Sequence, residues 1–101
     1  MTEKQLEFNR DCAFFLQWKN KGMVNLEMWV SDRTPIGANT NELLFHKDWN
    51  WLMDVVKKAL DICFEEDQVN DYYYILDAVP DIDTVVERTH SFIKKLNLNK
   101  T

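Results

Sequence analysis

The sequence predicts an α+β fold, a small alpha-beta-alpha sandwich in which helices lie against a sheet. Three segments carry apolar residues at helical spacing, and three shorter segments have the alternation or the composition of strands. Along the chain these segments give the order α-β-β-α-β-α. The 101 residues, of which 46% are hydrophobic, are enough for one compact core and too few for two ordinary ones, so residues 1–101 are expected to form a single domain.

The first helix and the first strand are predicted from capping and alternation signals. Thr2 followed by Gln5 fits a capping box, which starts a helix over residues 3–19. The Asn-Lys-Gly sequence at residues 20–22 supplies a stop signal. Apolar and polar residues then alternate over residues 23–30, which predicts a half-buried strand.

Turn-forming residues dominate the next segment, residues 31–41, which is predicted to be the longest loop. Residues 42–45 have the composition of a short strand that leads into a second helix, with Asp48 as its N-cap. This helix is expected to end near Phe64. The acidic residues 65–67 would otherwise lie at the negative end of the helix dipole.

The last third of the chain is predicted to contain a strand, a turn and a helix. Residues 71–77 include three consecutive Tyr and have strand composition, and residues 78–81 form a turn around Pro80. From Asp81 onward the apolar residues follow a single helical stripe. This final helix is therefore expected to pack on one side only.

The helix over residues 48–64 carries two neighbouring apolar stripes. The first stripe is Trp49, Leu52, Met53, Val56, Leu60 and Cys63, and the second is Trp51, Val55, Ala59 and Ile62. Together they cover an arc of roughly 200°, whereas a surface helix needs roughly 100° or more. The helix is therefore expected to contact a sheet on one side and another helix or a second subunit on the other. A homo-oligomer joined through Trp51, Val55 and Ile62 is the corresponding interface hypothesis.

Charge and composition limit the classes of partner and the location of the chain. The 12 basic and 17 acidic residues give a net charge of -5, which argues against broad nucleic-acid binding. The start of the chain is polar, and no apolar stretch is long enough to cross a membrane, so a cytoplasmic protein is expected. Cys12 and Cys63 lack metal-ligand spacing and are expected to be reduced and mostly buried.

A ligand site is predicted around His46 and Lys47, which come just before the second helix. The free N–H groups of a first helical turn attract anions, and Lys47 adds a positive charge. Asp48 opposes this role because its carboxylate is expected to take the same donors. Arg33 in the preceding loop and Trp51, whose ring can stack on a base, complete the candidate ligand-binding residues.

The aromatic residues are numerous, with four Trp, six Phe and three Tyr, and three roles stay open for them. They can fill the core, anchor a protein partner or stack on a ligand. For catalysis the sequence offers no known motif, so no catalytic residue, metal or cofactor is predicted. A metal-dependent hydrolase would need the acidic residues between positions 65 and 83 to converge in a cleft, and their spacing does not fit a calcium-binding loop.

Part of the sequence resembles a family. The Trp-x-Trp-Leu-Met-x-Val-Val sequence at residues 49–56, its flanks over residues 44–58 and the closing helix around residues 85–94 resemble a group of small uncharacterised proteins from phages and prophages of Bacteroidetes. Residues 9–15 resemble the opening helix of that group more loosely. The chain differs at Asp54, where the group usually has Pro, and after Lys94, where a typical Trp-Tyr-Asn ending is replaced.

The resemblance implies an alpha-beta-alpha sandwich and a phage accessory protein that acts in the cytoplasm of a bacterial host. It provides no catalytic residues. Combined with the features above, it leads to the hypothesis of a non-enzymatic binding or anti-defence module, which binds a host protein or sequesters a small nucleotide signal. The alternatives are a small metal-dependent hydrolase built on the acidic segment, and a purely structural or regulatory phage module.

Overall fold

The computed structural model describes residues 2–22 and 27–99. Within these ranges the fold is mixed α+β, with four α-helices, one short 3-10 helix and a two-stranded antiparallel sheet. In chain order the elements are α1 (Glu3–Phe15), β1 (Lys19–Asn20), β2 (Trp29–Val30), the 3-10 helix η1 (Thr40–Glu42), α2 (Trp49–Glu65), α3 (Val69–Leu76) and α4 (Ile82–Asn99).

Helix α1 begins where the sequence predicts and ends earlier. The capping box is confirmed, since the Gln5 N–H donates to Thr2 Oγ1 at 3.1 Å and the Thr2 N–H donates to Gln5 Oε1 at 3.0 Å. At the other end Gln17 adopts a left-handed backbone with φ of 63°. The Trp18 N–H then donates to the carbonyl of Ala13 at 2.9 Å, which closes a Schellman motif and stops the helix. The prediction that the helix reaches residue 19 is therefore wrong.

The hairpin that follows α1 is short. Lys19 pairs with Val30 and Asn20 pairs with Trp29, so the predicted strand is confirmed at its end, while residues 23–26 lie outside the described residues. Trp29 also forms a bridge with Ala38 in the loop after β2. That loop needs its glycine at position 37, because φ is +92° and a Cβ would lie 2.6 Å from Met28 Cγ.

The strand predicted over residues 42–45 is wrong. Asn39 and Glu42 form a reciprocal capping box, in which the Asn39 N–H donates to Glu42 Oε1 at 3.0 Å, and this closes the helical turn η1. Leu43 and Phe45 follow in irregular backbone and are fully buried. The apolar residues of this segment are therefore explained by their burial in the core. The segment does not pair with another strand among the described residues.

The strand predicted over residues 71–77 is also wrong, because this segment belongs to helix α3. Its buried and half-buried side chains, Tyr72, Ile75 and Leu76, are spaced three and four residues apart, while Tyr73 and Tyr74 are exposed. Packing against α2 and α4 outweighs the strand preference of three consecutive Tyr.

Helix α2 follows the prediction closely. The Asp48 side chain caps it by accepting from the Asn50 N–H at 2.8 Å. The helix ends at a second Schellman motif, in which Asp67 has φ of 58° and the Gln68 N–H donates to the carbonyl of Cys63 at 2.7 Å. Helix α4 begins at Ile82, directly after Asp81. The Asp81 carboxylate accepts a hydrogen bond from the Thr84 hydroxyl at 2.6 Å.

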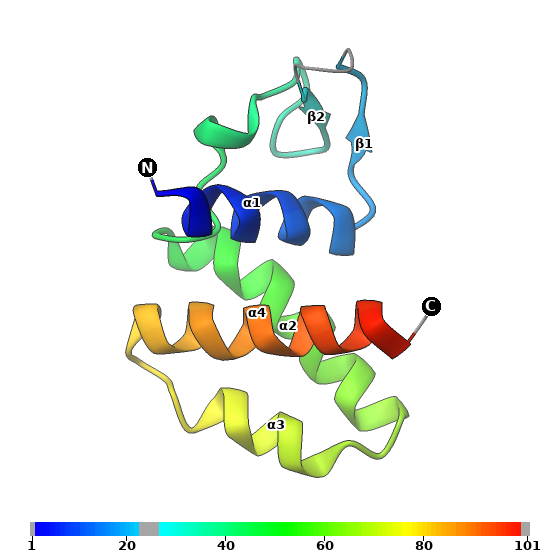
Figure 1. The fold of residues 1–101 in the computed structure, drawn as a ribbon, viewed down its shortest axis with the longest axis vertical. Coiled ribbons are helices and arrows are strands. Elements are labelled where there is room, and N and C mark those ends of the chain that lie inside the picture. Colours follow the sequence, from blue (N-terminus) through cyan, green and yellow to red (C-terminus); the bar gives the residue numbers. More distant parts are fainter. Residues whose placement is uncertain (1, 23–26, 100–101) are drawn as a thin grey trace.

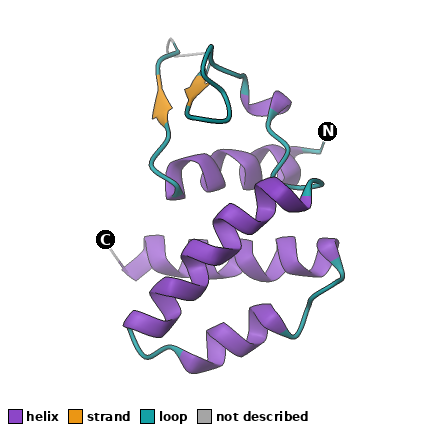
Figure 2. Ribbon diagram, turned by 180° about the vertical axis from the view of Figure 1, so that it is seen from behind, coloured by secondary structure: helices purple, strands orange, loops and turns teal. Residues whose placement is uncertain are grey.

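The helices make a two-layered unit. Helices α1, α4 and α3 lie one below the other, and α2 crosses them diagonally on the far side (Figure 1), as the view from behind confirms (Figure 2). The hairpin lies beyond α1, at one end of the molecule (Figure 1). A sheet between two layers of helices is thus not confirmed. None of the helices in the described ranges has the length and apolar character that crossing a membrane requires.

Because α2 crosses the other helices, most side chains of its two apolar stripes are covered within one chain, although Met53 of the first stripe is exposed. The buried core contains Phe8, Cys12, Ala13, Trp29, Leu43, Phe45, Leu52, Val55, Val56, Ala59, Cys63, Ile75, Ala78, Val85, Phe92 and Ile93. The wide apolar arc of the helix is therefore explained by packing inside the chain.

Candidate functional site

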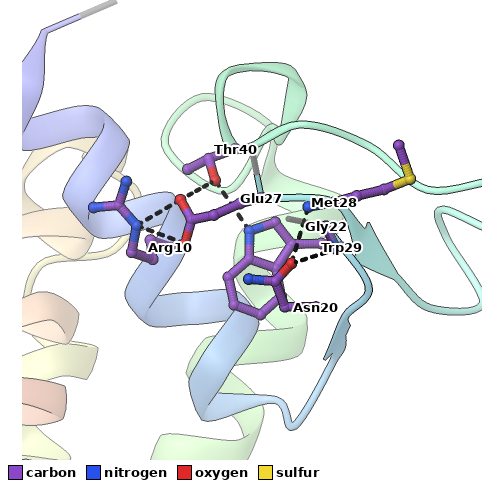
Figure 3. A network of polar contacts seen from close by, with 7 residues as sticks. All are labelled: Arg10, Asn20, Gly22, Glu27, Met28, Trp29 and Thr40. Carbon is purple, nitrogen blue, oxygen red and sulfur yellow. Dashed lines mark hydrogen bonds and ion pairs between the residues drawn. The ribbon is translucent and has the colours of Figure 1, made fainter. Parts of the chain in front are cut away.

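A polar network ties the hairpin to α1 (Figure 3). The Arg10 Nε–H donates to both carboxylate oxygens of Glu27, at 2.7 and 2.9 Å. The Thr40 hydroxyl donates to Glu27 Oε1 at 2.9 Å, and the buried Trp29 indole N–H donates to Thr40 Oγ1 at 3.0 Å. Every polar group in this chain of contacts has a partner. Trp29 therefore serves the core and does not offer a stacking surface.

Trp51 lies in an aromatic cluster. Its ring centroid is 5.7 Å from that of Trp18 and 5.2 Å from that of Phe45, and both pairs have edge-to-face geometry. Phe45 is fully buried, and the two Trp side chains are half-buried. The predicted stacking residue is thus already packed against other rings of its own chain.

The structure brings Arg33 and Trp51 together. The Arg33 guanidinium lies 5.7 Å from the centroid of the Trp51 ring, donates from Nε to Asp54 Oδ2 at 2.6 Å, and donates from Nη2 to the carbonyl of Asn50 at 3.0 Å. The hydrogen bond that Arg33 donates to Asp54 raises the pKa of Arg33. Arg33 and Trp51, two of the candidate ligand-binding residues, are therefore adjacent, but the Arg33 guanidinium already pairs with Asp54.

A groove of about 620 Å³ lies beside this ion pair. Its lining includes Trp18, Lys19, Asp32, Arg33 and Asp54. Two cationic side chains thus face the groove together with two carboxylates. This balance of charge weakens the attraction for a phosphate group.

The His46 side chain contacts helix α1 and lies apart from the Arg33 groove. The buried Asn9 side chain on α1 donates from Nδ2 to the carbonyl of Leu43 at 3.0 Å and lies 3.1 Å from His46 Nδ1. The side-chain oxygen Oδ1 of Asn9 lies 3.4 Å from the same ring nitrogen, so the tautomer of His46 decides which group donates. Burial lowers the pKa of His46, and the positive charge of Lys47 lowers it further. His46 therefore helps to join α1 to the segment before α2, while Lys47 is exposed.

The stability of the folded chain is expected to depend on the protonation of His46. Because its pKa is below the ordinary value of 6.5 when folded, the unfolded chain takes up the proton first as the pH falls. The contribution of neutral His46 is complete above pH 6.5 and is lost as the pH falls from there toward the folded pKa. Urea unfolding of the wild type and His46→Gln between about pH 7.5 and about pH 5 measures this effect. The stability difference between them should shrink on acidification, and a constant difference would contradict the assignment.

The residues of the predicted oligomer interface lie on α2 in different environments. Val55 is fully buried in the core of the single chain, and Trp51 and Ile62 are half-buried and packed against that core. The burial of Val55 therefore needs no second copy of the protein. Self-association through this stripe stays a prediction.

An exposed apolar surface lies elsewhere, where α2 meets α3. We call it the α2–α3 patch; it consists of Met53, Leu60, Phe64, Val69, Tyr72 and Tyr73. Two pockets of about 410 and 420 Å³ lie on it and share Phe64 and Tyr72. Sequence reasoning missed this patch because it assigned α3 as a strand. A helical reading of residues 69–76 would have placed Val69 and Tyr73 next to the end of α2.

The acids of the segment between positions 65 and 83 lie apart from the three-ligand group found among the described residues. In the part of the chain that the structure describes, none of the acids between positions 65 and 83 belongs to a group of three converging metal-ligand side chains. Asp71 pairs with Lys95 at 3.0 Å, and Asp81 accepts from Thr84. Cys12 and Cys63 are free and buried, as predicted, and burial raises the pKa of both thiols.

Comparisons of the chain with protein-family models, with curated proteins and with solved structures each find no match. The resemblance to phage proteins thus stays a prediction. The groove at Arg33 and the α2–α3 patch are two surfaces on which a function can be built.

Proposed function

We propose that this protein is a non-enzymatic binding module that docks a partner protein on the α2–α3 patch. The observation that carries this proposal is the exposure of large apolar side chains across one continuous surface. In line with the resemblance to phage proteins, we propose a phage accessory protein, with an anti-defence role, that acts in the cytoplasm of a bacterial host and takes a host protein as its partner.

The exposure of this patch favours a docking role. Phe64 is 82% exposed, Tyr73 is 58% exposed and Val69 is 51% exposed. Burying a large apolar side chain completely is worth about 1.5–3 kcal/mol, so this surface forgoes several kcal/mol while it faces water. Aromatic side chains are also enriched among the residues that dominate binding energy in protein interfaces. A partner that covers Phe64 and Tyr73 recovers this free energy.

The charges around the patch indicate the chemistry of the partner. Asp54 and Asp61 line one pocket together with Lys57, and Asp67 lines the other. With a net charge of -5 for the whole chain, the field at this surface is negative. The fitting partner is therefore an apolar segment flanked by Lys or Arg side chains.

The other hypotheses have less support. Sequestration of a small nucleotide would use the groove at Arg33, but Asp54 already holds this guanidinium and two carboxylates face the groove. A hydrolase built on the acidic segment finds no group of three converging metal-ligand side chains among the described acids of that segment. A structural or regulatory module without a partner leaves the exposure of Phe64 unexplained.

Site-specific photo-cross-linking tests the proposal. A photoreactive phenylalanine analogue replaces Phe64 in one variant and Phe14 in another, since Phe14 is a second exposed aromatic residue (72%) outside the patch. In bacterial cells, position 64 is expected to yield a discrete cross-linked host protein that position 14 does not yield. That complex should weaken with rising salt, because the acidic rim contributes to binding.

The substitutions Phe64→Ser and Phe14→Ser complete the test with the purified partner. Phe64→Ser is expected to weaken binding by at least about tenfold, whereas Phe14→Ser should leave the affinity unchanged. A cross-link from position 64 to a second copy of the chain would show that the patch joins two copies of this protein and does not bind a host protein. Equal cross-linking from both positions would overturn the docking role of the patch.

A further inference from the structure

Three side chains with metal-binding atoms converge where α1 packs against α4. Glu7 and Asp11 are four residues apart and share one face of α1, and His90 approaches them from α4. One ligand atom from each side chain lies within 4.8 Å of the other two. His90 Nε2 and Asp11 Oδ2 are 2.7 Å apart.

His90 is held in position. Its side chain is only 4% exposed, and the ring packs edge-to-face on Phe8 with the centroids 5.2 Å apart. The two carboxylates are more accessible, with the Glu7 side chain 48% exposed. The arrangement thus combines a fixed imidazole with carboxylates that can adjust, so little reorganisation is needed to bring the ligands together.

We propose that Glu7, Asp11 and His90 form a binding site for a divalent transition-metal ion, with Zn²⁺ as the best-fitting candidate. One imidazole nitrogen and two carboxylate oxygens are a donor set that suits zinc and leaves a further position for water. Ligand atoms about 2.1 Å from a tetrahedral ion lie roughly 3.4 Å apart. The ion would take the place of the direct contact between His90 and Asp11, and it would balance the two negative charges.

A cleft of about 370 Å³ lies beside His90, the imidazole ligand of the proposed site. Its lining includes Gln5, Phe8, His90, Ser91 and Lys94, whereas the Glu7 and Asp11 carboxylates lie outside this lining.

Lys94 competes with the metal for Glu7. Its Nζ lies 3.2 Å from Glu7 Oε1, and both side chains are about half exposed. An ion pair with this exposure is weak, so the Glu7 carboxylate can exchange the ammonium group for a metal ion. Removing Lys94 should therefore strengthen metal binding, an effect that a purely structural cluster would not show.

Isothermal titration calorimetry of the full chain with Zn²⁺ tests this site. We expect one ion per chain for the wild type and a loss of affinity of at least about tenfold in Asp11→Asn and Glu7→Gln. Asp11→Asn keeps the shape and the hydrogen-bonding capacity of the side chain, and circular dichroism of each variant verifies its fold. Lys94→Ala should bind up to about fivefold more tightly. Glu87→Gln, which changes an exposed carboxylate in the same cleft, should bind as the wild type does.

Nuclear magnetic resonance of the imidazole nitrogens locates the ion independently. Zinc is expected to shift the Nε2 resonance of His90 and to leave that of His46 unchanged. No binding by the folded wild type, equal affinity in wild type and Asp11→Asn, or a shift confined to His46 would each overturn the proposal. Because the α2–α3 patch contains none of the three ligands, failure of either proposal leaves the other intact.

Discussion

Replacing Phe45 by alanine is expected to lower the free energy of unfolding by about 3–5 kcal/mol. Phe45 is fully buried, and its ring contacts those of Trp18 and Trp51 at centroid distances of 5.1 and 5.2 Å. The substitution removes the apolar burial of the ring and leaves a cavity between two helices and the segment before the hairpin. Urea unfolding monitored by circular dichroism measures the loss, and the fluorescence of the neighbouring Trp residues should change as well.

Phe64→Ala is the matched control for this prediction. It also truncates a phenylalanine, this time on α2, but Phe64 is 82% exposed. The free energy of unfolding is therefore expected to change by no more than about 0.5 kcal/mol. A similar loss in both variants would contradict the placement of Phe45 at the centre of the core.

The substitution Asn9→Leu is expected to cost about 1–3 kcal/mol of folding free energy. Asn9 is fully buried, its amide donates to the carbonyl of Leu43, and its Nδ2 lies 3.1 Å from His46 Nδ1. Leucine has a similar shape but no donors, so the buried carbonyl of Leu43 loses its amide donor. Thermal or urea unfolding measures the cost, and amide hydrogen exchange near Leu43 should accelerate because the connection to α1 is weakened.

Asn70→Leu serves as the control because Asn70 is exposed on α3. It should leave stability unchanged or raise it slightly, since leucine favours a helix more than asparagine does. If Asn9→Leu were equally neutral, the amide of Asn9 would not be what holds α1 to the segment before α2.

The parts of the fold that the sequence predicts correctly have local causes. The capping box at Thr2 and Gln5 and the N-cap at Asp48 act within one helical turn, so neighbouring residues suffice to recognise them. The two-stripe pattern of α2 likewise indicated a helix with more than one packing partner. These features need no knowledge of what lies across the fold.

The errors arise where distant contacts or unusual backbone conformations decide the outcome. Gln17 ends α1 in a left-handed conformation that glycine usually supplies, so no residue type marked this end. The tyrosines of α3 favour a strand locally, and only the packing of Ile75 against the rest of the core makes the segment helical. Neither cause can be read from neighbouring residues.

The candidate sites show the same division. Arg33 and Trp51 were chosen for their chemistry, and they do lie together, but the partner that neutralises Arg33 could not be foreseen. That partner is Asp54 on α2. The convergence of Glu7, Asp11 and His90 depends on the packing of α1 against α4. Asp11 and His90 are 79 positions apart in the sequence, so local patterns cannot reveal it.

The hairpin beyond α1 is held differently from the helices. Apolar side chains join the helices to one another, whereas the hairpin depends on one buried indole and on charged and hydroxyl partners contributed by Arg10, Glu27 and Thr40. Cooperativity between two parts of a domain follows from the contacts they share. The attachment of the hairpin to the helices therefore rests on these polar contacts and on the burial of Trp29.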